Sequence, residues 1–415
     1  MTPEQSRRRV LAVALGRQPA DVVLKGGQVV DVYTRRVLDQ AVVGLAGERI
    51  AFLGPETKGL IGPKTLVEDL EGAYLLPGFI DAHTHLDSIF QSRAFVSKAL
   101  PFGNTTSVTE TAMIAAALGP EGVDLFRQDA AGLPMRIFFL TPSLSPPLPA
   151  LETSTGFDDR AFERLLARPE VLGMGECYWP PVLDGDQRIL FRFPRAEALG
   201  KTIEGHAAGA KGRKLMAYRA AGVLSCHEAI NAQDARDRIS LGLTTMIREG
   251  YVRREMDQVL PGLSPRDLDS GLVVLVTDLA DPEELLNAGG MNLLLKKAVS
   301  LGVDPLRAVQ MVTLNPARHF NLRLLGSITP GKLADMTAVA DLKDFRCLKV
   351  WTGGQQVAQE GKLTAELRRF SYPDWTLNSF DLEPPRPEDL AMKAQGRQVR
   401  ARLVVVDGET ITRAE

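Results

Sequence analysis

Four of the five histidines in this chain lie at the ends of apolar segments that are typical of β-strands. His83 and His85 follow the first such segment in "FIDAHTHLDS", whereas His206 and His227 close "KTIEGH" and "AGVLSCH". Because His83 and His85 are two residues apart, their side chains project to the same face of an extended chain. Imidazoles in this arrangement can bind one divalent metal ion together.

Two carboxylates occupy equivalent positions in the sequence. Glu176 ends the segment "VLGMGE", and Asp278 ends "LVVLVTD". With the histidines they form a set of nitrogen and oxygen donors, which suits Zn²⁺, Fe²⁺ or Mn²⁺ better than a site of soft thiolates would. The predicted metal ligands are His83, His85, Glu176, His206, His227 and Asp278.

Each of these residues alone has another interpretation. A His-x-His pair is about as often a hydrogen-bonded polar feature as a metal clasp. Glu176 alone would more often be a capping or solvated carboxylate, and Asp278 alone an N-cap before "LADPEEL". The complete set of six donors at five strand ends favours the metal centre.

The charges of these donors favour two ions over one. Four neutral imidazoles, two carboxylates and a bridging hydroxide carry a formal charge of about −3, which nearly balances two divalent cations. Glu176 is the natural bridge between the ions. Such ions lower the pKa of bound water from about 15.7 to roughly 7, so we expect hydrolytic attack on an electron-poor carbon.

Eight strand-like segments that alternate with Ala- and Leu-rich helical segments position these donors. The alternation predicts an α/β fold, a (β/α)8 TIM-like barrel with its active site at the carboxyl ends of the strands. The eight segments are "YLLPGFID" from Tyr74, "TTSVTE" from Thr105, "RIFFLTP" from Arg136, "VLGMGE" from Val171, "KTIEGH" from Lys201, "AGVLSCH" from Ala221, "TTMIRE" from Thr244 and "LVVLVTD" from Leu272.

Short β-rich runs flank the barrel segment on both sides. They begin with "DVVLKGGQVVDVYTRRVLDQAVVGLAGERIAFLG" and return in "GSITPGKLADMTAVADL" and "FRCLKVWTGGQQV". We therefore expect a second, small β-sandwich-like domain built from both chain ends. The predicted boundaries are 1–73 for its N-terminal part, 74–325 for the barrel, and 326–415 for its C-terminal part and the tail.

Composition excludes several classes of partner. The 415 residues are 45% hydrophobic and 24% charged, with a formal net charge of −2, so neither a nucleic acid nor another polyanion is an expected partner. No run approaches the roughly 18 apolar residues of a membrane span. The start, "MTPEQSRRRVLAVALGRQ", has too short an apolar stretch for a signal peptide and predicts a short amphipathic helix.

The three cysteines and the fifth histidine are expected to be structural. Cys177, Cys226 and Cys347 have no CxxC spacing, which argues against a disulfide framework and for a reducing, cytoplasmic location. Strand alternation turns Cys177 and Cys226 away from the metal side, as small buried hydrophobes. His319 lies in "NPARHFNL", away from any strand end.

Several ordered motifs resemble the adenine deaminases of the amidohydrolase superfamily. The most specific are "EGHAAGAKGRKLMAYRAAGVLSCHEA" and "REG", whereas "PGFIDAHTH" is shared by many amidohydrolases. The resemblance runs from about residue 20 to about residue 340. It implies a binuclear metal centre on a distorted TIM barrel, a 6-aminopurine as substrate and release of ammonia.

The resemblance also implies roles for individual residues. It carries over the six ligands named above, with Glu176 as the bridging glutamate that takes the place of a carboxylated lysine in hydantoinase-like relatives. Asp278 would move a proton from the hydroxide to the leaving amine, and Glu228 would protonate a ring nitrogen. For Glu228, an acid at a helix N-terminus is the competing interpretation.

The chain departs from the family at positions that should shape the substrate pocket. The usual Asp-Pro-His-Glu is replaced by Glu110-Thr111-Ala112-Met113, the second Asp of Thr-Asp-Asp by Leu279, and the serine after Arg-Glu-Gly by Tyr251. The family also continues for another domain-sized stretch beyond "VRARLVVVDGETIT". These departures affect the identity of the amine more than the metal site.

The leading hypothesis is therefore a metal-dependent aminohydrolase that acts on adenine or a related heterocyclic amine through a metal-activated hydroxide. One alternative is ring opening by a cyclic amidohydrolase, of the dihydroorotase or hydantoinase kind, which would use the same ligands. Another is a metal-binding paralogue without activity. By analogy with the family, a homo-oligomer, either a dimer or a larger assembly, is expected.

Overall fold

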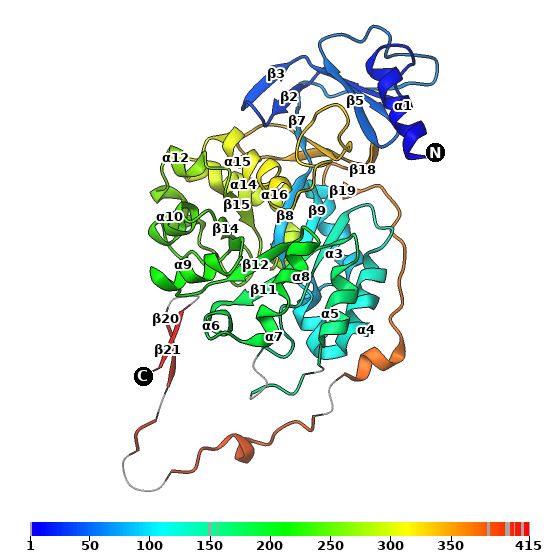
Figure 1. The fold of residues 1–415 in the computed structure, drawn as a ribbon. Coiled ribbons are helices and arrows are strands. Elements are labelled where there is room, and N and C mark those ends of the chain that lie inside the picture. Colours follow the sequence, from blue (N-terminus) through cyan, green and yellow to red (C-terminus); the bar gives the residue numbers. More distant parts are fainter. Residues whose placement is uncertain are drawn as a thin grey trace. The chain divides into compact units, whose positions relative to one another are not determined.

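The structure is a computed structural model of the 415-residue chain. It describes residues 2–147, 151–154, 156–379, 382–394, 399–401, 403–407 and 411–414 (Figure 1). The chain divides into two compact units, Met1–Phe370 and Ser371–Glu415. The first unit contains the predicted strands and all five histidines.

Eight parallel strands form the centre of the first unit, in a five-stranded sheet of order β12-β11-β10-β9-β8 and a three-stranded sheet of order β13-β14-β15. A backbone hydrogen bond of 2.9 Å from Leu224 to Ile203 links the β13 and β12 edges, and one of 3.0 Å from Asp278 to His83 links the ends of β15 and β8. The predicted α/β class is therefore confirmed. The strands are β8 (Phe79–Thr84), β9 (Asn104–Thr109), β10 (Arg136–Thr141), β11 (Val171–Tyr178), β12 (Thr202–His206), β13 (Ser225–Cys226), β14 (Thr244–Arg248) and β15 (Val273–Val276).

The predicted first strand is divided at Gly78. Its first part is β7 (Tyr74–Pro77), which belongs to another sheet, and its second part is β8. A Cβ atom at residue 78 would lie 2.1 Å from Oγ1 of Thr105, so only glycine allows β9 to approach here.

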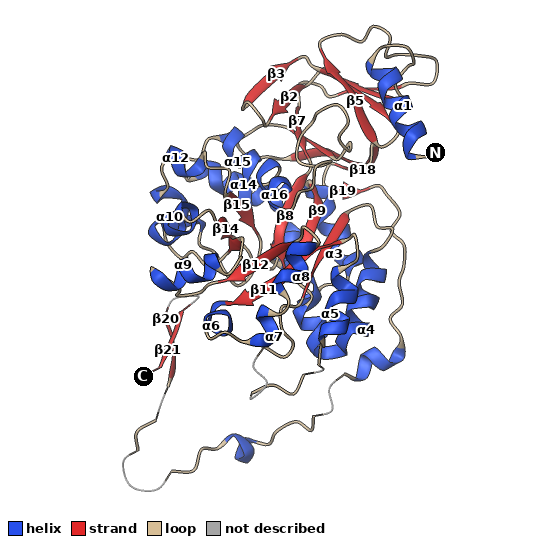
Figure 2. Cartoon of the chain, viewed as in Figure 1, coloured by secondary structure: helices blue, strands red, loops and turns tan. Residues whose placement is uncertain are grey.

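The parallel strands are buried because helices cover them (Figure 2). All four residues of β15 are buried, and alternate residues of several strands form one apolar cluster that includes Ala82, Val108, Leu140 and Met246. The helices are α2 (Leu86–Ile89), α3 (Ser92–Ala99), η1 (Leu100–Phe102), α4 (Ala112–Ala130), α5 (Asp159–Leu166), α6 (Trp179–Leu183), α7 (Gln187–Leu190), α8 (Phe193–Ala198), α9 (Arg213–Ala220), α10 (Ala232–Ser240), α11 (Met256–Val259), η2 (Leu260–Gly262), α12 (Pro265–Leu268), α13 (Pro282–Asn287), α14 (Met291–Ser300), α15 (Pro305–Met311) and α16 (Leu314–His319).

Strands from both sides of the parallel region share a seven-stranded sheet of order β19-β18-β17-β16-β7-β2-β3. β7 connects the two sets, because it pairs in parallel with β2 and antiparallel with β16. A four-stranded sheet of order β5-β4-β1-β6 lies in the same unit. The strands are β1 (Val22–Lys25), β2 (Gln28–Asp31), β3 (Arg36–Asp39), β4 (Val42–Ala46), β5 (Arg49–Gly54), β6 (Leu66–Asp69), β16 (Met336–Val339), β17 (Cys347–Thr352), β18 (Gln355–Gln359) and β19 (Lys362–Leu363). The β-sandwich-like domain and its boundaries stay predictions.

The expected N-terminal helix is present as α1 (Pro3–Ala14), and Thr2 and Gln5 form its capping box. The second unit contains the one-turn helices η3 (Asp374–Asn378) and η4 (Pro387–Leu390) and a hairpin of β20 (Val404–Asp407) and β21 (Ile411–Ala414). Among the described residues, no helix has both the length and the apolar character to cross a bilayer.

Candidate metal centre

The structure brings all six predicted donors to the carboxyl ends of five strands. His83 lies in β8 and His85 directly after it, whereas Glu176 lies near the end of β11. The others follow the same rule: His206 is the last residue of β12, His227 follows β13, and Asp278 follows β15. Parallel strands direct these ends to one side of the molecule, so residues up to 195 positions apart become neighbours.

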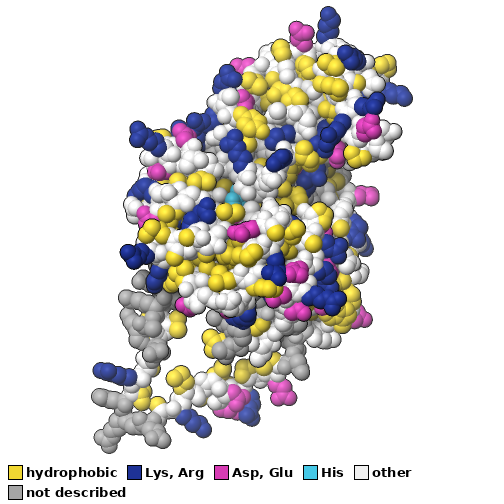
Figure 3. Space-filling view, in the orientation of Figure 1, with side chains coloured by type: hydrophobic (Ala, Val, Ile, Leu, Met, Phe, Trp, Pro, Cys, Tyr) yellow, Lys and Arg dark blue, Asp and Glu magenta, His cyan; other side chains and the backbone are white. Residues whose placement is uncertain are grey.

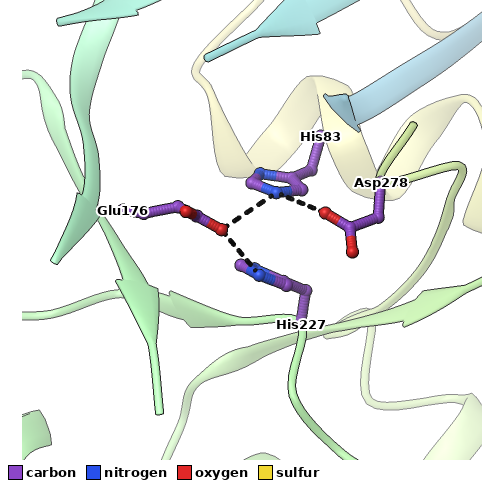
Figure 4. A group of neighbouring side chains, drawn as sticks. All are labelled: His83, Glu176, His227 and Asp278. Atoms are coloured by element: carbon purple, nitrogen blue, oxygen red, sulfur yellow. Dashed lines mark ion pairs between the residues drawn. The ribbon is translucent and has the colours of Figure 1, made fainter. Parts of the chain in front are cut away.

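Glu176 is the centre of the cluster. Its Oε1 atom lies 2.9 Å from Nε2 of His227 and 3.2 Å from Nδ1 of His206. The same oxygen lies 3.5 Å from Nε2 of His83 and 3.7 Å from Nε2 of His85. Figure 4 shows this carboxylate directed at both His83 and His227. One oxygen therefore faces four imidazoles, which places Glu176 at the centre of the predicted donors.

Asp278 approaches the histidine pair from the end of the neighbouring strand β15. Its Oδ1 atom lies 3.1 Å from Nε2 of His83 (Figure 4). The same oxygen lies 3.4 Å from Nε2 of His85. Donor atoms of His83, Glu176, His227 and Asp278 all lie within 4.8 Å of one another, close enough to hold one ion. A second such group consists of His206, His227 and Glu228.

The residues fit a metal by their chemistry as well as by their spacing. His83 is 2% exposed, and its Nε2 atom has no hydrogen-bond partner among the described residues although it faces two carboxylate oxygens. A buried nitrogen without a hydrogen bond is costly unless another group, such as a metal ion, completes its surroundings.

Electrostatics show that the cluster favours positive charge. Burial alone would lower the pKa of His83, but the facing carboxylates of Asp278 and Glu176 raise that pKa to about 10. Burial alone would raise the pKa of Glu176, but hydrogen bonds from the imidazoles, His206 first, hold that pKa well below its ordinary value. The pKa of Asp278 is likewise well below its ordinary value, because the facing imidazoles of His83 and His85 outweigh burial. Divalent cations would supply this positive charge in place of protons.

Glu110, which the sequence singles out only as part of a departure from the family, lies beside the predicted ligands. It follows β9, is 1% exposed, and its Oε1 atom accepts a 3.1 Å hydrogen bond from the backbone N–H of Glu176. The same oxygen lies 3.9 Å from Nδ1 of His83. Burial and the charge of Glu176 raise the pKa of Glu110 to about 8. Its position at the end of "TTSVTE" was the available signal, since Glu176 and Asp278 occupy the same kind of position.

Arg248, the last residue of β14, was not predicted as a site residue. Its Nη1 atom lies 2.7 Å from Oε1 of Glu228 and 3.2 Å from Oδ2 of Asp278, and its Nη2 atom lies 2.7 Å from Oε1 of Glu255. Glu228 also lies 3.2 Å from Nε2 of His227. The structure therefore places Glu228, the predicted proton donor, beside the six donors and in an ion pair with Arg248.

The residues expected to be structural lie outside the cluster. His319 is at the end of α16, where its Nδ1 atom lies 2.9 Å from Oγ1 of Thr244 and its Nε2 atom 2.9 Å from both carboxylate oxygens of Glu204. The three cysteines are buried free thiols.

The three departures from the family have different environments. Met113 and Tyr251 are 56% and 57% exposed, respectively. Leu279 has a φ of 154°, directly after Asp278 at 56°. The loop after β14 packs closely against this segment. The glycine of "REG" is required there, because a Cβ atom on Gly250 would lie 1.9 Å from the carbonyl oxygen of Thr277.

Comparisons with known proteins identify the family of this chain. Residues 74–357 match the model of the amidohydrolase family. The chain is 35% identical to an adenine deaminase of Paracoccus denitrificans (strain Pd 1222), over 99% of this chain and 70% of that protein. It is 36% identical to adenine deaminase 1 of Jannaschia sp. (strain CCS1), over 98% and 69%.

Solved structures show the same fold at low identity. A beta-aspartyl dipeptidase from Fervidobacterium islandicum AW-1 superposes with a TM-score of 0.64 at 17% identity, covering 84% of this chain and 98% of that chain. A dihydropyrimidinase from Brevibacillus agri NCHU1002 gives 0.62 at 16% identity, covering 82% and 96%. The chain belongs to the amidohydrolase family, in the group of the adenine deaminases. It is thus a metal-dependent hydrolase that acts on C–N bonds, and the predicted resemblance is confirmed.

Proposed function

We propose that this chain deaminates adenine or a related aminated purine or heterocycle, giving the oxo product and ammonia. The observation that carries the proposal is the convergence of four imidazoles on Oε1 of Glu176, with the Asp278 carboxylate in the same group. The relatives named adenine deaminase supply the substrate class. The proposal includes related amines because the chain departs from the family at three positions. These are the exposed Met113 and Tyr251 and Leu279, whose backbone is strained.

The proposed ligands of two divalent ions, Mn²⁺, Fe²⁺ or Zn²⁺, are the six predicted donors, with Glu176 shared between the ions. Their nitrogen and oxygen atoms and the unpartnered Nε2 atom of His83 support this assignment. When bound, the ions lower the pKa of water to roughly 7 and so supply hydroxide at neutral pH. His83, His85, Glu176, His206, His227 and Asp278 are the residues concerned.

The residues of the chain then move protons. Oδ1 of Asp278 takes the proton of the attacking hydroxide and delivers it to the amine, while Arg248 holds Oδ2 at 3.2 Å. Glu228 passes to a ring nitrogen the proton that water loses on becoming hydroxide, which makes the attacked carbon more electrophilic. A C–O bond forms, the C–N bond breaks, and ammonia leaves as the carbonyl of the product forms.

Further parts of the proposal concern architecture and location. The two curled parallel sheets, joined at both edges, support a distorted (β/α)8 barrel, and the seven- and four-stranded sheets support a small β-sandwich-like domain at residues 1–73 and 326–415. Three buried free thiols support a cytoplasmic location. We retain a homo-oligomer as part of the proposal.

Ammonia release from a panel of aminopurines, nucleosides and pterins, measured with metal-replete protein, tests the proposed function. We expect stoichiometric ammonia and oxo product from adenine or one related amine. Silence across the panel would reject the deaminase proposal, and ring-opened products without ammonia would identify a cyclic amidohydrolase instead.

A further inference from the structure

Two fully buried polar side chains on the covering helices bind the backbone beside the proposed metal ligands. They are Tyr218 on α9 and Arg238 on α10, which are 0% and 1% exposed. Neither side chain belongs to the ligand set. Each makes contacts with two different strand ends, so their side-chain hydrogen bonds link these ends in addition to the pairing of the strands.

The hydroxyl of Tyr218 connects the ends of β11 and β12. It accepts a 3.0 Å hydrogen bond from the backbone N–H of His206 and donates one to the carbonyl of Cys177. Cys177 directly follows Glu176, so one phenol oxygen binds the backbone next to the bridging carboxylate and the backbone of a histidine ligand.

The β11–β12 ladder is irregular at this place. Its register shifts between Met174 and Cys177, the stretch that contains Glu176. The hydroxyl of Tyr218 joins the two strands where the ladder regains its register. Gly205 makes room for the approach, because a Cβ atom there would lie 2.3 Å from the carbonyl oxygen of Ser225 and 3.0 Å from the hydroxyl of Tyr218.

Arg238 connects the loops that follow β12 and β13. Its Nη2 atom donates to the carbonyl of Ala207 at 3.0 Å and to that of Glu228 at 3.4 Å. Its Nε atom donates to Sγ of Cys226 at 3.1 Å. Ala207 follows His206, while Cys226 and Glu228 flank His227. Its Nη1 atom donates to the backbone carbonyl of Asp234 at 2.9 Å. The guanidinium thus binds backbone carbonyls and the thiol.

We infer that Tyr218 and Arg238 are positioning residues that fix the spacing of Glu176, His206 and His227 for metal binding. The inference rests on the proposed metal centre. Groups that orient metal ligands from outside the coordination sphere typically contribute about 10–100-fold in metal affinity. A variant that lacks the contacts of either side chain should therefore bind metal more weakly although it still folds.

Direct titration of Mn²⁺ into the metal-free, full-length chain tests the inference without use of activity. Free Mn²⁺ is measured by electron paramagnetic resonance for wild type, Tyr218→Phe and Arg238→Lys. Tyr33→Phe is the matched control, because the hydroxyl of Tyr33 contacts Ser327 instead of a strand end of the site. Thermal unfolding of the metal-free proteins is recorded in parallel.

We expect Kd for Mn²⁺ to rise about 10–100-fold in Tyr218→Phe and Arg238→Lys and to stay unchanged in Tyr33→Phe. Wild-type Kd in both site variants would overturn the inference, even if both unfold at lower temperature, since the side chains would then be structural only. If Tyr218→Phe does not fold, Arg238→Lys decides by itself. A wild-type chain that binds no Mn²⁺, Zn²⁺ or Fe²⁺ would instead reject the metal centre, and the inference with it.

Discussion

Asp278 is held by its backbone and by its side chain. Its φ of 56° lies in the left-handed region, and its N–H donates to the carbonyl of His83 at 3.0 Å. Its two carboxylate oxygens face different partners, Nε2 of His83 and Nη1 of Arg248. An aspartate is one of the few residues that tolerate this backbone conformation, so the turn and the chemistry select the same residue type.

Asp278→Asn should separate catalysis from structure. Asparagine tolerates the left-handed conformation and keeps the size of the side chain, but it cannot accept and return a proton. We expect kcat to fall by about 10²–10⁴-fold while the fold is retained. Ammonia release and metal content per chain are measured on the same preparation. Near-normal turnover in metal-loaded Asp278→Asn would contradict the proposed proton transfer.

Glu110 and Arg248 show why residue type and position predict only part of a site. Both end strands, as the predicted donors do, but their importance depends on partners from other strands: the N–H of Glu176 for Glu110, and Glu228 with Asp278 for Arg248. Spacing along one strand contains no information on such contacts. Metal-type donors were predictable because histidine is rare in this chain and its positions coincide with strand ends.

At the scale of elements, alternation of apolar and helical segments located all eight parallel strands. It did not separate β7 from β8, because the two strands form one continuous apolar run in the sequence. Only their pairing partners show that they belong to different sheets. It also did not divide α4, in which Gly119 has φ 66° and Pro120 follows. Local pattern predicts the type of an element, whereas its partners and breaks depend on tertiary contacts.

Gly250→Ala tests the close contact between the loop after β14 and the Asp278 segment, which follows β15. The new Cβ atom would lie 1.9 Å from the carbonyl oxygen of Thr277 and 2.5 Å from that of Leu279, so the backbone must shift. We expect a loss of about 1–3 kcal/mol in the free energy of unfolding, measured by urea denaturation of the metal-free chain. Gly156→Ala is the control, because nothing lies within 4 Å of its Cβ position. Equal stability of both variants would show that this contact adapts freely.

At the scale of the first unit, charges of both signs are interspersed on the face drawn in Figure 3, as the net charge of −2 leads one to expect. One ion pair is different, because it joins the parallel sheet to the seven-stranded sheet. Nε of Arg136, at the start of β10, donates to Oδ2 of Asp335 at 2.6 Å, and the N–H of Gly353 donates to Oδ1 at 2.7 Å. The backbone carbonyl of Asp335 accepts from Gly78, where β7 and β8 separate.

Asp335→Asn should therefore destabilise the first unit. The Asp335 side chain is 3% exposed, but that of Arg136 is 31% exposed, so water screens part of the attraction. We expect a loss of about 1–2 kcal/mol in the free energy of unfolding. Asp344→Asn removes an exposed partner of Lys296 and should change the stability by less than about 0.5 kcal/mol. Comparable losses in the two variants would show that this junction contributes no more than a surface pair.

Metal removal should affect both parallel sheets, because the proposed ligands lie on each of them: His83, Glu176 and His206 on one, His227 and Asp278 at the ends of the other. Ions bound across both sheets stabilise only the folded chain, by about 2.7 kcal/mol when free metal is 100 times its Kd. We therefore expect chelation to abolish ammonia release and to lower Tm, and added Mn²⁺, Fe²⁺ or Zn²⁺ to restore both. The ion that restores activity at the lowest concentration would identify the preferred metal. Full activity after exhaustive chelation, with metal content confirmed as zero, would contradict the role proposed for the six ligands.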